Sequence, residues 1–179
     1  TLLMIALSAA VNVTLFDKLS FNFLRDIAPV ATISRNLFVM VAHPSIPAKT
    51  GPALIAYAKA NPRKLNMASP GSGTPGHVAG ELFKMMSGVD MVHVPYRGAT
   101  GAVPDVLSGQ LQVSFEIAGL LAEYIRVGKL RALAVTTAER WEGLPDIPTV
   151  GEFVPGFAVS SSGGIGVPKN TPTEIIEKL

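Results

Sequence analysis

The stretch KLNMASPGSGTPGHVAGELFKMM, residues 64–86, decides the fold because an apolar run, a glycine-rich turn and a helical run follow one another in it. Residues 64–68 predict a strand. The following helix is expected from Pro75 to Met86, with Thr74 as its N-cap and proline in its first turn. Between them GSGTPG, residues 71–76, matches G-x-G-x-x-G. A strand, a glycine loop and a helix in this order are typical of α/β proteins.

The same alternation continues outward from this stretch in both directions. Further strands are expected at residues 1–7, 38–41, 91–94, 111–115, 130–135 and 163–167, and further helices at 51–60, before Leu107, and at 120–127. The central strands are continuously apolar, which predicts a parallel sheet buried on both faces. Right-handed crossovers then bring the carboxyl ends of these strands to one edge, where ligands bind in such sheets. The loops expected there are 69–76, 95–98, 116–119 and 136–140.

The glycine loop allows two interpretations. A dinucleotide fingerprint needs an acidic residue at the end of the next strand, and that strand ends in VPYR, residues 94–97. Arg97 is suited to a 2′-phosphate, so an NADP-like oxidoreductase domain remains the alternative. The favoured interpretation is a seat for a smaller anion, because a helix start offers unpaired N–H groups and the positive end of its dipole. Ser72 adds a hydroxyl donor to this seat.

The composition and the remaining polar residues exclude several function classes. The 179 residues carry a formal charge of +2 without a Lys/Arg cluster, which argues against nucleic-acid binding. The absence of cysteine excludes disulfides and cysteine-based chemistry. His43, His77 and His93 lack ligand spacing with paired carboxylates, so neither a metal nor another cofactor is expected. No G-x-S-x-G elbow frames a serine nucleophile, and we expect no enzyme. The uncharged residues 1–16 fall short of a membrane span and show no basic leader, so a strand and a small-residue loop are expected there.

Three motifs resemble one known family. They are HVPYRG (93–98), GKLRALAVT (128–136) and LPDIPTV (144–150), and the likeness extends from FDKLSFNFLRDIAPVATI (16–33) to GVPKNTP (166–172). They resemble the tripartite tricarboxylate transporter receptors, or Bug proteins, which are bacterial periplasmic solute-binding proteins. The resemblance implies a two-domain, type II-like Venus flytrap with parallel or mostly parallel sheets, of which this chain holds one near-complete domain and part of a second. Both ends of the chain look truncated.

The resemblance also implies the domain plan and the function. Residues 1–41 would belong to domain 1, residues 42–159 form domain 2, and residues 160–179 return to domain 1. The receptor would capture a small organic carboxylate between the domains and deliver it to the membrane subunits of a tripartite transporter. It would be a periplasmic monomer, not embedded in the membrane, with apolar surface exposed where missing parts pack.

The candidate ligand-binding residues come from the residue pattern and from the family resemblance. Tyr96 and Arg97 leave a strand at the ligand edge, where a guanidinium can orient a carboxylate. The resemblance adds Ser8 and Asn12 of the small-residue loop, residues of the glycine loop, and Glu116, which follows a later strand. It predicts that these residues line one cleft. The full set is Ser8, Asn12, Ser69, Gly71, Gly73, Thr74, Pro75, His77, Tyr96, Arg97 and Glu116.

Overall fold

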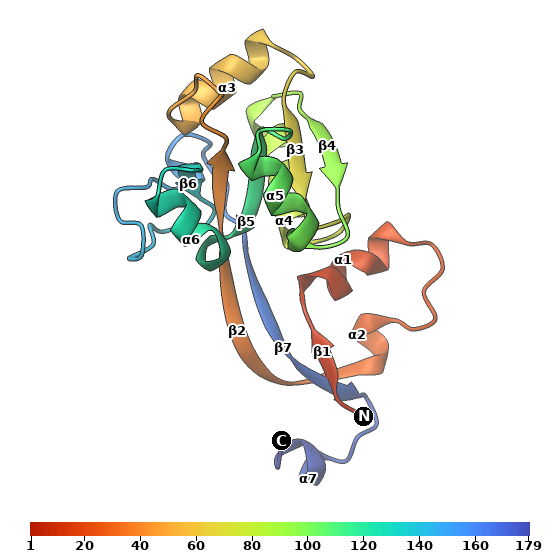
Figure 1. The fold of residues 1–179 in the computed structure, drawn as a ribbon. Helices are drawn as coiled ribbons and strands as arrows, with labels where there is room; N and C mark the ends of the chain where they lie inside the picture. Colours follow the sequence, from red (N-terminus) through yellow and green to blue (C-terminus); the bar gives the residue numbers. More distant parts are fainter. The chain divides into compact units, whose positions relative to one another are not determined.

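The computed structural model describes residues 1–179 and divides into two compact units (Figure 1). Unit 1 comprises residues 1–36 and 161–179, and unit 2 comprises residues 37–160. Two strands are shared between the units, β2 (Ile27–Ala42) and β7 (Ser160–Pro168). The domain boundaries expected for the full receptor, after residues 41 and 159, remain a prediction.

The sheet of unit 2 has the strand order β4-β3-β5-β2-β6. It contains β3 (Asn66–Ser69), β4 (Val92–Pro95), β5 (Val113–Ile117), β6 (Arg131–Val135) and the second half of β2. β3 pairs in parallel with β4 and β5, whereas β2 pairs antiparallel with β5 and β6. Four strands therefore run in one direction, which confirms the expected mostly parallel sheet, and β2 is the exception.

Helices cover both faces of this sheet, as the continuously apolar strands predict. Alternate residues of a strand point to opposite faces. Met40 and Met67 pack in one core with α3 (Gly51–Ala60), α4 (Pro75–Ser87) and the segment around the short 3-10 helix η1 (Val150–Glu152). Val41 and Ala68 pack in a second core with α5 (Ala99–Leu107) and α6 (Ala118–Arg126).

Apart from β2, the predicted elements of unit 2 lie within two residues of the observed ones. The helix expected at residues 75–86 ends at Ser87, where Gly88 takes the left-handed conformation that commonly ends helices. The strands expected at 64–68 and 111–115 begin two residues later, at Asn66 and Val113. β2 starts well before the expected strand at 38–41, because its first half belongs to unit 1.

Unit 1 corrects two predictions. The strand expected at residues 1–7 is only β1 (Leu3–Ile5), and it is largely exposed rather than buried. The small-residue loop expected after it is a helix, α1 (Leu7–Leu15). Alanine and leucine are strong helix formers, so this apolar sequence suits a helix as well as a loop. The strand expected at residues 163–167 is confirmed within β7, which pairs antiparallel with β1. α2 (Phe23–Asp26) and the one-turn α7 (Thr173–Ile176) complete the unit.

The apolar core lies almost entirely in unit 2. Val167 is the one buried apolar side chain contributed by unit 1, and several large apolar side chains of that unit are exposed. The exposed ones include Leu2, Met4, Phe16, Leu24, Ile33 and Ile175. None of the helices has both the length and the apolar character needed to span a membrane.

Candidate functional site

Three helices of unit 2 begin at the same edge of the sheet. The parallel strands β3, β4 and β5 end at Ser69, Pro95 and Ile117, and each is followed by a helix, α4, α5 and α6. Every helix start presents unpaired N–H groups and a partial positive charge. The carboxyl edge of the sheet is therefore electropositive through its backbone, as the sequence pattern predicts.

The loop between β3 and α4 requires its glycines. Gly73 has φ +78°, a left-handed conformation that strains other residues. Gly71 has φ +148°, and a Cβ on it would lie 3.0 Å from the Tyr96 carbonyl oxygen. A side chain at either position would change the path of the loop.

The hydroxyl groups of Ser69 and Thr74 hold the loop together. Ser69 is fully buried, and its Oγ accepts a hydrogen bond from the Gly71 N–H at 3.2 Å. The Thr74 hydroxyl donates to the Gly71 carbonyl oxygen at 2.7 Å and accepts from the His77 N–H at 3.4 Å, as an N-cap does. Both hydroxyls are therefore occupied inside the protein.

The free donors of the loop lie at Ser72 and Gly76. Ser72 is exposed, and neither its amide nor its hydroxyl has a partner in the protein. The amide of Gly76, in the first turn of α4, has no partner either. The candidate set did not contain these two residues, although Gly76 is the third glycine of the motif and Ser72 stands between the first two.

The loop after β4 is fastened to the glycine loop. The Tyr96 N–H donates to the Ser69 carbonyl oxygen at 3.0 Å, and the Gly98 N–H donates to that of Pro70 at 2.8 Å. The Tyr96 hydroxyl donates to the Asp105 carboxylate, and this hydrogen bond raises the pKa of Tyr96. The Arg97 side chain is exposed and forms no ion pair, so its charge is available at this edge.

Glu116 lies beneath the same edge in the interior of unit 2. Its side chain is 2% exposed, and its Oε1 has no hydrogen-bond partner. Burial raises its pKa to about 7, although a hydrogen bond from the Ile117 N–H acts in the opposite direction. It adjoins a small apolar void lined by Val103, Leu121 and Leu130. In this arrangement its carboxyl does not reach the surface of unit 2.

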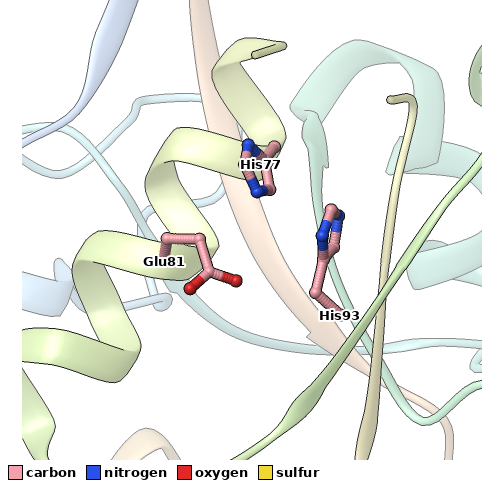
Figure 2. Close-up of side chains that lie close together, drawn as sticks. All are labelled: His77, Glu81 and His93. Atoms are coloured by element: carbon pink, nitrogen blue, oxygen red, sulfur yellow. The ribbon is translucent and has the colours of Figure 1, made fainter. Parts of the chain in front are cut away.

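Two histidines and a glutamate lie close together in unit 2 (Figure 2). His77 and Glu81 project from α4 and His93 from β4, and their ligand-type atoms lie within 4.8 Å of one another. The imidazole rings of His77 and His93 stack with centroids 4.2 Å apart. The sequence spacing did not predict this cluster, although His77 and Glu81 stand four residues apart on a helix and therefore share a face.

The hydrogen bonds of this cluster do not fit a metal site. A neutral imidazole has one free lone pair, and that of His77 Nδ1 accepts the Gly73 N–H at 3.1 Å. Both Glu81 oxygens contact the Lys84 ammonium, at 2.9 and 3.0 Å. The His77 Nδ1 lone pair and both Glu81 oxygens are therefore already used within the protein.

One contact resembles a catalytic pair, although no sequence motif marks a serine nucleophile. Ser69 Oγ and His93 Nε2 share a hydrogen bond of 2.7 Å. Residues 69 and 93 are far apart in sequence, but β3 and β4 are neighbours with Met67 opposite His93, so all three side chains share one face. Because Ser69 is fully buried and its oxygen already accepts the Gly71 N–H, a substrate cannot reach it.

Ser8 and Asn12 belong to unit 1. They lie four residues apart on α1, so they share one face of that helix, and both are half-buried. Their place in the ligand cleft remains a prediction.

Comparisons with known proteins agree with this architecture. The family described as tripartite tricarboxylate transporter family receptor matches residues 1–179. The protein BugT of Bordetella pertussis is 34% identical over 182 residues, covering 100% of this chain and 56% of BugT. A solved R. palustris protein with adipate superimposes with a TM-score of 0.85 at 34% identity, covering 91% of this chain and 55% of the other. MatC from Rhodopseudomonas palustris with bound malate gives a TM-score of 0.89 at 28% identity, covering 99% and 61%.

The chain spans about half the length of the curated relatives it matches. Its fold is that of the periplasmic binding proteins. The matched family is one of transporter receptors and not of enzymes, in agreement with the expected class of protein. Since the family model matches every residue, the chain belongs to the tripartite tricarboxylate transporter receptor family.

Proposed function

We propose that this chain carries the anion seat of an extracytoplasmic receptor that captures a small organic carboxylate. The ligand carboxylate would sit at the carboxyl edge of the unit 2 sheet, against the glycine loop and the start of α4. The observation that carries this proposal is the pair of unpartnered amides at Ser72 and Gly76 at a helix N-terminus. Backbone N–H groups at a helix start are a common binding site for carboxylates.

The loop is built to keep these amides in place. The hydroxyls of Ser69 and Thr74 and the ring of His77 hold the other loop groups, so binding a ligand requires little new ordering. The exposed guanidinium of Arg97 supplies a cation at the same edge and can pair with a carboxylate in two hydrogen bonds. A dicarboxylate then has two recognition points in unit 2.

The remaining parts of the function rest on the family. We propose that the receptor works in the periplasm and delivers its ligand to a tripartite tricarboxylate-type transporter. The family resemblance also assigns Ser8 and Asn12 to the ligand, whereas Glu116 lies beneath the seat in the interior of unit 2. The adipate and malate in the two related structures make dicarboxylates the first ligands to test.

Calorimetric titration of the receptor with adipate, malate and the uncharged diamide of adipate tests the proposal. We expect saturable binding of at least one dicarboxylate and none of the diamide, because the amides of the seat need an anion. The same titration with NADP tests the alternative function. Binding of NADP without any carboxylate would favour a nucleotide-binding domain and contradict the receptor proposal.

A further inference from the structure

The ring of His77 is joined to the glycine loop by a hydrogen bond that depends on the charge of the ring. Gly73 is buried, has φ +78° and donates its N–H to His77 Nδ1 at 3.1 Å. A neutral imidazole accepts this bond, whereas a protonated imidazole carries hydrogen on both nitrogens and has no lone pair to offer. The loop conformation is therefore compatible with only one charge state of His77.

The groups around the His77 ring belong to α4 and β4. On α4 these are Glu81 and Lys84, which pair with each other, and on β4 the ring of His93 stacks on His77 (Figure 2). The glycine loop itself contains no titratable side chain. The stacked rings cannot both become charged at low cost, because like charges at this distance repel.

The surroundings of His93 disfavour its charged form. Burial lowers the pKa of His93, as do the neighbouring His77 and Lys84, while Glu81 acts in the opposite direction. Its Nε2 also shares a hydrogen bond with the buried Ser69 hydroxyl. His77 is the ring that contacts the loop, so it is protonation of His77 that would break the bond from Gly73.

We propose that His77 is a positioning residue of the anion seat, whose neutral ring holds Gly73 in place and whose protonation releases the loop and the ligand. The proposal rests on the carboxylate seat proposed above.

The test compares adipate affinity at pH 7.5 and pH 5.5 in the unmodified receptor and in two variants. His77→Asn keeps an oxygen that can accept the Gly73 N–H at either pH. Between pH 7.5 and pH 5.5, we expect the adipate affinity of the unmodified receptor to fall about tenfold more than that of His77→Asn. Comparing the two proteins cancels the effect of protonation of adipate, because both meet the same ligand at each pH. His77→Leu removes the acceptor, so its affinity should be low at both pH values. His43→Asn, at a histidine that contacts Ser45, should behave like the unmodified receptor.

Equal acid sensitivity of the unmodified receptor and His77→Asn would overturn the proposal, and so would an affinity that rises at pH 5.5.

A second readout needs no ligand. The NMR signal of the Gly73 amide should shift, and its hydrogen exchange should accelerate, as the unmodified protein is acidified, but not in His77→Asn. If no carboxylate binds at pH 7.5, the proposed function fails, and the Gly73 amide still decides the role of His77. A Gly73 amide whose NMR signal and hydrogen exchange do not change with pH in the unmodified protein would contradict that role.

Discussion

A Cβ placed on Gly76 would lie 2.3 Å from the carbonyl oxygen of Phe115. The first turn of α4 therefore rests directly on the backbone of β5, and this contact sets the position of the anion seat relative to the sheet. The neighbouring oxygen is main chain in a central strand and cannot move aside as a flexible side chain can.

Gly76→Ala is expected to destabilise the protein by about 3 kcal/mol or more, because the helix must lift from the sheet to accept a methyl group. Gly119 in the first turn of α6 is the matched control, since a Cβ added there would have nothing within 4 Å. Gly119→Ala should be neutral or stabilising by about 0.5 kcal/mol. Chemical denaturation of both variants measures this, and equal stability of the two would contradict the contact.

The Thr74 side chain is expected to matter for binding as well as for stability. Thr74→Ala removes the N-cap of α4 and the hydrogen bond from the Thr74 hydroxyl to the Gly71 carbonyl oxygen. We expect this to lower the free energy of unfolding by about 1 kcal/mol. Thr50→Ala removes the equivalent cap of α3, where Thr50 Oγ1 accepts the Ala53 N–H at 3.3 Å. Both variants should lose similar stability, but only Thr74→Ala should lower adipate affinity, by several-fold in calorimetry. A similar loss of affinity in Thr50→Ala would show that the effect is not local to the loop.

The strand, loop and helix around the glycine motif could be predicted because each signal there is local. Thr74 and Pro75 mark the start of α4, and Gly88 marks its end. α1 was missed because its residues are apolar and small without a buried face, so no period distinguishes helix from loop. The first half of β2 was missed for a similar reason, since residues 31–35 are exposed and show no alternation between buried and exposed positions.

The candidate site was predicted in outline but not in its division of roles. The sequence shows that Ser69, Ser72 and Thr74 are all potential donors, but only the fold shows which hydroxyls turn inward. Ser69 and Thr74 are used within the loop, and Ser72 remains free. The approach of His93 to Ser69 depends on the register of β3 and β4, which no local pattern specifies.

The buried carboxyl of Glu116 is expected to make stability depend on pH. Its pKa is raised from about 4.5 to about 7, so the folded protein binds this proton more tightly than the unfolded chain. The contribution of Glu116 to stability is therefore fully present below about pH 4.5 and is lost as the pH rises through about 7, at a cost of about 3 kcal/mol. Glu116→Gln cannot ionise and should remove this part of the pH dependence.

Urea unfolding at pH 5 and pH 8 measures this difference. The unmodified protein should lose more stability between the two pH values than Glu116→Gln, which keeps an oxygen to accept the Ile117 N–H. Parallel curves for the two proteins would mean that Glu116 is ionised in the folded state at neutral pH and that another group compensates its charge.

The central claim is that a ligand carboxylate binds against the unpartnered amides of the glycine loop, and substitution of Ser72 tests it most directly. Ser72→Asp places a carboxylate at the seat, where it repels an anionic ligand and occupies the free amides. Ser72→Asn has nearly the same shape without the charge, and the exposure of residue 72 leaves the fold of both variants intact. In calorimetric titration with adipate, the account predicts at least a tenfold loss of affinity for Ser72→Asp relative to Ser72→Asn. Equal affinities of the two variants would contradict it.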